Sequence, residues 1–205
     1  MAHTTQESRP QQDAAVADDR DLVTRCQAGD REAFNDLMRR HQRRIFNAVL
    51  RMLGDYSQAE EIAQDTFVRA YQAIKGFRQE SKFSTWLYTI AINLCRNRLR
   101  RNACACSRTV SLDEPIACGD GEIQREIPDT TQSPDKALEA KEQMGLIQKA
   151  IDELDDDFRE VVVLRDIQQL AYDEIAAALG IAEGTVKSRI HRARHVLQER
   201  LKDVI

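Results

Sequence analysis

Glycine, proline and tryptophan are scarce in this chain, whose 205 residues include eight glycines, four prolines and one tryptophan. Because glycine and proline interrupt helices, this scarcity suits long helices separated by short breaks. No strand-like alternation persists anywhere, and no apolar run approaches the roughly 18 residues of a membrane span. These absences predict an all-α fold and argue against a transmembrane protein.

A secretory signal and an excess of basic charge are also missing. Residues 1–20 are polar and acidic, so we expect a cytoplasmic chain with its five cysteines reduced. The chain has 30 basic against 34 acidic side chains, a net charge of -4, which argues against a generic nucleic-acid binder. The local distribution of charge therefore decides whether any surface can bind nucleic acid.

Apolar periodicity divides the chain into four segments. Residues 1–17 show none, and we expect a disordered leader there. Residues 18–102 are predicted to form a four-helix domain, and residues 136–205 a second all-helical domain. Between them, residues 103–135 lose the helical period and collect glycine, proline and acids. We thus predict two small helical domains joined by an acidic flexible linker.

Capping residues predict the helix boundaries. In the first domain we expect a short helix over 19–28 and a long one that begins at an Asp30 cap and ends at Gly54. A third helix should run from a capping box at Ser57–Glu60 to Ala73, and a fourth from Ser84 or Thr85 to about Arg101. In the second, Ser133 and Pro134 suit a helix start, and the expected helices are 135–153, 156–168, 172–179 and 183–202.

The end of the second domain has the pattern of a helix-turn-helix. A short helix stops at Gly180, the turn Ile181–Ala182 follows, and a longer basic helix begins. Apolar side chains at helical spacing let the two helices pack together: Ile175, Ala176 and Leu179 on the first, and Val186, Ile190, Ala193 and Leu197 on the second.

The opposite face of the second helix carries donors and cations. Side chains able to read base edges in a DNA major groove are Lys187, Ser188, His191 and Arg192. Thr185, Arg189 and Arg194 suit phosphate contacts beside them. For the charge alone, a solvated basic face is the simpler interpretation. The turn and the two packing faces together favour DNA reading.

The fourth expected helix carries an aromatic, small polar and basic face: Trp86, Thr89, Asn93, Arg96 and Arg100. Such a face offers a single nucleic-acid strand a ring to stack on, edge-reading groups and phosphate neutralisation. The preceding loop adds Phe77, Lys82 and Phe83. A small helical domain also needs aromatic core residues, which is the commoner role for any one of these rings. The residues leave both alternatives open.

Three linker cysteines, Cys104, Cys106 and Cys118, are candidates for a thiol switch or a metal site. A C-x-C pair with one distant cysteine is a weak pattern, and no histidine lies between His41 and His191. We therefore expect no metal and no cofactor.

Long motifs in both domains are similar to a known family. The segments are "AEEIAQDTFVRAY", "FRQESKFSTWLYTIAINLCRNRLR" and "FREVVVLRDIQQLAYDEIAAALGIAEGTVKSRIHRAR". Their order and separation resemble the extracytoplasmic-function group of sigma-70-type transcription initiation factors, over about residues 18–203. The resemblance implies that residues 18–102 are similar to sigma2, which docks on RNA polymerase and opens the promoter -10 element. Residues 136–205 resemble sigma4, which reads the -35 element and contacts the polymerase flap.

The resemblance also implies site residues. Gln64, Asp65 and Arg69 match the helix that binds the clamp coiled coil of the largest polymerase subunit, although a solvated charged face is the alternative. The loop that captures a flipped non-template base, and the helix that holds the strand, are matched by Ser81, Lys82, Phe83, Ser84, Thr85, Trp86, Thr89, Asn93 and Arg96. The -35 readers are matched by Lys187, Ser188, His191 and Arg192.

Residues 111–135 carry seven carboxylates against one base, a local charge of -6. The family resemblance implies that this segment threads toward the polymerase active-site cleft, while a plain tether is an equal alternative. We also hypothesise that it competes with DNA for the two basic faces. The implied partners are core RNA polymerase, promoter DNA as duplex and as single strand, and an anti-sigma factor, without membrane insertion.

Two other functions are weighed against this one. A free-standing helix-turn-helix regulator needs a ligand pocket or phospho-acceptor in its first domain, and a thiol or metal enzyme needs a Cys-His-acid constellation that the sequence does not supply. We therefore predict an alternative sigma factor that is not an enzyme and that acts in a stress response.

Overall fold

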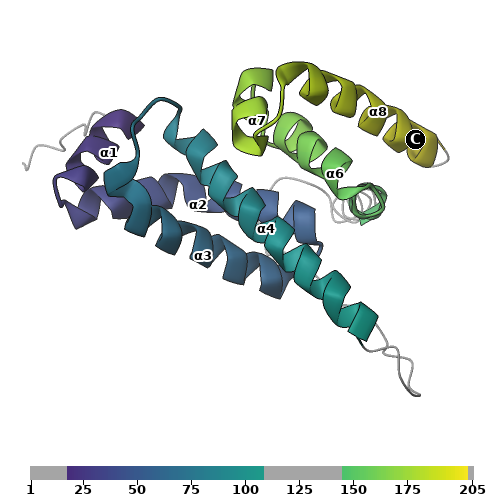
Figure 1. Cartoon of the computed structure of the whole chain (residues 1–205), viewed down its shortest axis with the longest axis horizontal. Coiled ribbons are helices and arrows are strands. Elements are labelled where there is room, and N and C mark those ends of the chain that lie inside the picture. Colours follow the sequence, from purple (N-terminus) through teal and green to yellow (C-terminus); the bar gives the residue numbers. More distant parts are fainter. Residues whose placement is uncertain (1–17, 109–144, 203–205) are drawn as a thin grey trace, which may run out of the picture.

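The structure is a computed structural model that describes residues 18–108 and 145–202, with the side chains of 105–108 left aside. Within these ranges every regular element is a helix, which confirms the predicted all-α class (Figure 1). The expected leader, the Ser133 cap and the acidic segment 111–135 lie outside the described residues. We refer to residues 18–108 as the N-terminal half and to residues 145–202 as the C-terminal half.

The N-terminal half contains α1 (Asp19–Gln27), α2 (Arg31–Leu53), α3 (Tyr56–Ala73), a 3-10 turn η1 (Ile74–Gly76) and α4 (Phe83–Arg108). The predicted cap of α2 is confirmed, because the Asp30 carboxylate accepts bonds from the backbone N–H groups of Glu32 at 2.9 Å and Ala33 at 3.3 Å. The helix ends at Gly54, whose φ of 71° suits glycine.

Two predicted boundaries in this half are wrong. Asp55, and not Ser57, caps α3, since its carboxylate accepts the Gln58 N–H at 2.7 Å. An acid two residues upstream supplies the same acceptor and starts the helix earlier. Helix α4 continues seven residues past Arg101, because residues 102–108 contain neither glycine nor proline to stop it. Residues 103–108 therefore belong to a helix and not to a linker.

The C-terminal half begins with helical residues 145–152. It continues with α6 (Asp156–Val162), a π-helical turn η2 (Val163–Ile167), α7 (Tyr172–Leu179) and α8 (Glu183–Leu201). The last two helices agree with the sequence to within one residue, and Gly180 between them has the expected left-handed φ of 69°. The predicted helix 156–168 is α6 and η2 in succession.

The Arg159 guanidinium fastens the start of the C-terminal half. It donates to the carbonyls of Ile151 at 3.1 Å, Asp152 at 2.6 Å and Leu154 at 2.8 Å, and to the Asp156 carboxylate at 3.1 Å. A fifth bond, 3.2 Å long, reaches the Met52 carbonyl at the end of α2. One side chain thus satisfies the end of helix 145–152 and touches the other half.

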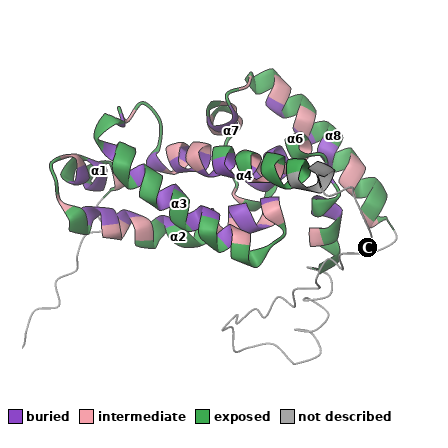
Figure 2. Ribbon diagram, turned by 60° about the horizontal axis from the view of Figure 1, so that its bottom comes forward, coloured by how far each residue is buried: buried purple, intermediate pink, exposed green. Residues whose placement is uncertain are grey.

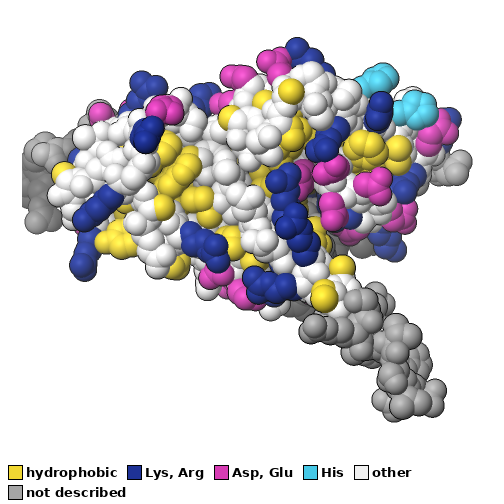
Figure 3. Space-filling model, viewed as in Figure 1, with side chains coloured by type: hydrophobic (Ala, Val, Ile, Leu, Met, Phe, Trp, Pro, Cys, Tyr) yellow, Lys and Arg dark blue, Asp and Glu magenta, His cyan; other side chains and the backbone are white. Residues whose placement is uncertain are grey.

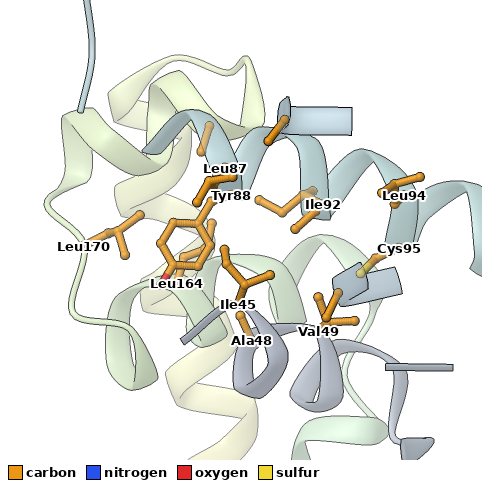
Figure 4. Close-up of a cluster of buried hydrophobic side chains, with 14 of the residues drawn as sticks. Ile45, Ala48, Val49, Leu87, Tyr88, Ile92, Leu94, Cys95, Leu164 and Leu170 are labelled. Carbon is orange, nitrogen blue, oxygen red and sulfur yellow. The ribbon is translucent and has the colours of Figure 1, made fainter. Parts of the chain in front are cut away.

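The two halves share one hydrophobic core. Helix α4 packs on α2 and α3 and, on another side, on α7, while η2 packs on α2. Figure 4 shows Ile45 and Ile92 of the N-terminal half beside Leu164 and Leu170 of the C-terminal half, all four buried. Buried residues recur along each of these helices between exposed ones (Figure 2). The described halves are therefore packed together, an arrangement that the sequence pattern did not reveal.

Candidate nucleic-acid interfaces

We define the strand face as Lys82, Trp86, Thr89, Asn93 and Arg96, at the start and along one side of α4. Its aromatic end is packed: the Trp86 ring stacks on Phe77 with centroids 4.7 Å apart and planes 19° apart, and Phe83 lies 5.8 Å from Trp86. Phe77 and Phe83 are buried, whereas Trp86 is half-buried. The structure thus gives these rings a packing role, and leaves only Trp86 partly accessible.

A cavity of about 340 Å³ opens beside the loop that precedes α4. Four predicted base-capture residues line it, namely Ser81, Lys82, Phe83 and Ser84. Asp19 of α1 lines it as well and is held by His41, whose Nε2 lies 2.8 Å from the carboxylate. This volume lies in the range of small-ligand pockets. The role of α1 was missed from the sequence, because no local pattern links Asp19 to a loop 60 residues away.

The predicted strand residue Thr85 is buried, and its hydroxyl has no hydrogen-bond partner within the described ranges. Thr89 donates to the Thr85 carbonyl at 3.1 Å, so its hydroxyl is committed to the helix backbone. Asn93 is exposed. Of the small polar residues predicted along α4, Asn93 therefore presents the most accessible side chain.

The two cations of the strand face are paired with carboxylates of the C-terminal half. Arg96 donates two bonds of 2.6 Å to Glu160, and this bonding raises the pKa of the guanidinium. Lys82 lies 2.8 Å from Glu174, which likewise raises its pKa. The sequence predicted both cations but not their partners, since the pairs join residues 64 and 92 positions apart.

We define the reading face as Lys187, Ser188, His191 and Arg192 on α8. All four are exposed, while Val186, Ile190 and Ala193 on the other side of the helix are buried. Figure 3 shows histidine and basic side chains together over α8. The amphipathic pattern predicted for this helix is therefore confirmed, and its polar face points to solvent.

The predicted phosphate contacts beside the reading face are less open. Arg189 pairs with Asp157 at 2.6 Å, and Arg194 is bonded to Asp166. Thr185 is half-buried, and its carbonyl accepts a bond from Ser188. Ion pairs between solvent-exposed side chains contribute little to stability, which applies most to Arg194.

Tyr172, at the start of α7, is a neighbour of these cations that the sequence did not single out. The Arg165 guanidinium lies 4.8 Å from its ring centroid and the Lys187 ammonium 5.7 Å. Such contacts hold a cation over an aromatic ring. Tyr172 thus helps to orient Lys187, which also pairs with Glu183 at 2.7 Å.

A third surface is an apolar groove of about 990 Å³ between α2 and α3, which we call the α2–α3 groove. All its lining residues come from these two helices. Val68 and Tyr71 are 54% and 45% exposed and line this groove, so their apolar side chains form part of its accessible wall. The predicted polymerase contacts Gln64, Asp65 and Arg69 are exposed on α3, and Gln64 lines the groove. The sequence analysis did not predict this groove, because helical spacing alone did not show that Val68 and Tyr71 are exposed.

The described cysteines differ in exposure, which bears on the predicted thiol or metal site. Cys26 and Cys95 are buried, Cys104 is exposed, and Cys118 lies outside the described ranges. Burial raises the pKa of Cys95 to about 12. Among the residues that the structure describes, no cluster of three or more metal-ligating side chains exists. No described helix is long and apolar enough to span a bilayer.

Comparison with known proteins identifies the family. The model for Sigma-70 region 2 matches residues 37–104, and that for Sigma-70 region 4 matches residues 144–197. The ECF RNA polymerase sigma factor SigW of Bacillus subtilis is 38% identical over 183 residues, which are 89% of this chain and 96% of that protein.

Two solved structures are similar over most of the chain, each at 26% identity. CnrH in complex with the cytosolic domain of CnrY has a TM-score of 0.67 and covers 90% of this chain and 97% of its own. The sigma factor RpoE in complex with the anti-sigma factor NepR, from Bartonella quintana, has a TM-score of 0.64 and covers 82% and 96%.

The chain therefore belongs to the sigma-70 family, in its extracytoplasmic-function group of alternative sigma factors, which direct transcription initiation. This confirms the resemblance stated from the motifs. A free-standing regulator does not account for the match to region 2, which covers most of the N-terminal half.

Proposed function

We propose that this sigma factor binds core RNA polymerase through the α2–α3 groove, holds the melted -10 strand on the strand face and reads the -35 element with the reading face. The observation that carries the proposal is the open reading face, with four donor or cationic side chains exposed on one side of α8 and a buried apolar seam on the other. A recognition helix needs this division of faces to enter a major groove.

For the -35 element, Arg192 and Lys187 suit the paired acceptors O6 and N7 of guanine. His191 and Ser188 add hydrogen bonds from the same face. Thr185 contacts a flanking phosphate. Arg189 and Arg194 contact others once they have left their carboxylate partners, Asp157 and Asp166. Phosphate contacts fix the position of the helix, and the exposed readers supply sequence preference.

For the polymerase, the α2–α3 groove offers apolar area flanked by polar groups. Val68 and Tyr71 supply the apolar contacts, and Gln64, Asp65 and Arg69 supply hydrogen bonds and charge around them. A helical partner such as a coiled coil fits a groove between two helices, with its apolar side chains inserted there. We assign the groove to the clamp of the largest polymerase subunit and the C-terminal half to the flap.

For the -10 element, the cavity beside Ser81 and Ser84 can receive an unstacked base, while Asn93, Arg96 and Lys82 contact the strand. Unstacking a base costs a few kcal/mol, so a pocket and phosphate contacts are needed to hold it. The factor makes and breaks no covalent bond in this role, and the polymerase supplies the chemistry. It acts in the cytoplasm, where promoter DNA and polymerase meet.

An anti-sigma factor is a further proposed partner. RpoE of Bartonella quintana and CnrH are described in complexes with NepR and with the cytosolic domain of CnrY, and both resemble this chain over most of its length. We propose that a comparable protein restrains this factor, and that the factor serves a stress response.

Run-off transcription with core polymerase on a library of genomic fragments tests the proposed function. The wild-type factor should produce discrete start sites. Val68→Asp should abolish them by placing a charge in the groove, whereas Tyr56→Asp, a matched change at an equally exposed residue that does not line the groove, should retain them. Absence of any start site with the wild-type factor would overturn the proposal.

A further inference from the structure

The three proposed interfaces differ in one respect. The α2–α3 groove is lined by α2 and α3 alone, and the reading face is exposed. The strand face, by contrast, has both of its cations bonded to the C-terminal half, at Glu160 and Glu174. The described arrangement therefore leaves two interfaces open and covers the third.

We propose that the C-terminal half is a lid over the strand face, in which Glu160 and Glu174 occupy the positions that strand phosphates take on Arg96 and Lys82. The free factor then holds a single strand only after the lid has moved away. This inference rests on the role proposed above for the strand face, and adds an autoinhibitory contact to it.

The Arg96–Glu160 pair is the stronger of the two contacts. Both bonds are 2.6 Å long and run in parallel from Nε and one terminal nitrogen to the two carboxylate oxygens. Glu160 is only 5% exposed, so water does not compete for it. Arginine binds carboxylate and phosphate with this same two-pronged geometry. A phosphate therefore cannot use these donors while Glu160 does.

The Lys82–Glu174 pair closes the other end of the strand face. The ammonium lies 2.8 Å from the carboxylate, and Glu174 also accepts the Ala171 N–H at 2.9 Å. That second bond fixes the carboxylate at the first turn of α7. Because the Lys82 side chain is largely exposed, this pair is screened by solvent and salt. It supports the lid less than Glu160 does.

Between the two ion pairs, buried side chains of α4 pack on the C-terminal half, so the closed position of the lid also buries apolar surface. We call this contact the apolar seal. Tyr88, one turn before Ile92 on α4, is buried and donates to Gln168 at 2.9 Å. Leu164 and Leu170 lie in the same cluster, as Figure 4 shows. Burial of these side chains favours closure, and the two ion pairs set the register of the C-terminal half on α4.

The lid also bears on the hypothesis that the acidic linker competes with DNA. That segment lies outside the described residues, so the hypothesis remains a prediction. Glu160 and Glu174 supply the same chemistry from inside the folded C-terminal half. Their positions are fixed by helices, which makes them the more specific competitors.

The test compares the double variant Glu160→Gln/Glu174→Gln with a matched control, Glu153→Gln/Glu199→Gln. Both remove two carboxylates from the C-terminal half, but Glu153 and Glu199 pair within it, with Arg200 and Lys202. The probe is a fluorescent pool of random 12-nucleotide single strands, because phosphate contacts do not depend on sequence. Anisotropy measures its affinity for the full chain without polymerase.

We expect the lid variant to bind the pool about tenfold more tightly than wild type, because a larger share of molecules is open. The control variant should bind the pool with an affinity within about twofold of wild type, since it loses the same negative charge but keeps the carboxylates on Arg96 and Lys82. The gain should vanish when Arg96→Ala/Lys82→Ala is added. An equal gain in the control, or a gain that survives this addition, would overturn the proposal.

Small-angle scattering on the same samples supplies the second measurement. The lid variant should have a larger radius of gyration than wild type and the control. If it stays as compact and binds no better, the two carboxylates do not hold the lid. If it expands without binding better, the lid does not cover the strand site. Either outcome rejects the inference, while start sites in run-off transcription report separately on the proposed function.

Discussion

The strand face on α4 and the reading face on α8 carry similar side chains but have different surroundings. Helix α8 buries one seam against α6 and α7 and leaves its opposite face to solvent. Helix α4 lies between α2, α3 and α7, so apolar residues emerge on several of its sides. The polar stripe of α4 therefore lies beside apolar residues that pack on α7. A stripe of cations on a helix is therefore open to solvent only where no other part of the chain packs on the apolar residues beside it.

The largest expected effect concerns the shared core. Leu164→Ala should lower the free energy of unfolding by about 2–5 kcal/mol, because it empties a fully buried site between the halves. His191→Ala on the open reading face should change it by less than about 0.5 kcal/mol. Urea unfolding followed by circular dichroism measures both. Two separate transitions, with only one shifted by Leu164→Ala, would show that the halves do not share a core.

The next effect separates reading from positioning on α8. Arg192→Ala should weaken binding to a mapped -35 duplex by about 1–3 kcal/mol and reduce the preference for that sequence. Arg189→Ala should weaken specific and random duplexes alike, because its proposed contact is a phosphate. Competition binding with both duplexes distinguishes the two. Equal loss of preference in the two variants would contradict these assignments.

A smaller effect is expected at the seal of the strand face. Tyr88→Phe removes the bond to Gln168 and should shift closure by about 0.5–1.5 kcal/mol toward the open form. Single-strand affinity should rise accordingly, and the free energy of unfolding should fall by a similar amount, because the bond is lost from the closed native state. If affinity falls instead, the Tyr88 hydroxyl contacts the strand and does not restrain the lid.

The same residue predicts a pH dependence. Burial raises the pKa of Tyr88 from 10.0 to about 12, so the packed form favours the neutral phenol. Its contribution to stability is complete below pH 10 and is lost as the pH rises toward 12. Unfolding measured across this window should lose more stability in wild type than in Tyr88→Phe, since phenylalanine does not ionise. Parallel curves for the two proteins would contradict the assignment.

The smallest expected effect tests how Tyr172 serves the reading face. Tyr172→Leu removes the ring beneath Lys187 and Arg165, and should weaken duplex binding by less than about 1 kcal/mol. Single-strand binding should not change, because the cations held at the Tyr172 ring, Arg165 and Lys187, are not those of the strand face. An equal loss for both probes would point to general destabilisation of the C-terminal half.

Local chemistry made much of this fold predictable. Asp30, Gly54 and Gly180 mark helix ends through their own caps and dihedral angles, and the α7–α8 seam follows from spacing alone. The reading face was predictable for the same reason, since one helix creates it. The bond from Arg96 to Glu160 was not, because it joins residues 64 positions apart in different halves of the chain. Sequence periodicity shows which side chains share a face, but not which other segment lies on it.

The five bonds of Arg159 are divided unequally, four ending within the C-terminal half and one on Met52 of α2. Separation of the halves breaks that single outward bond and keeps the inward four. With these bonds kept, helix 145–152 stays joined to α6, and this part of the C-terminal half does not depend on α2 for its shape. Lysine, with one nitrogen in place of three, would lose this independence.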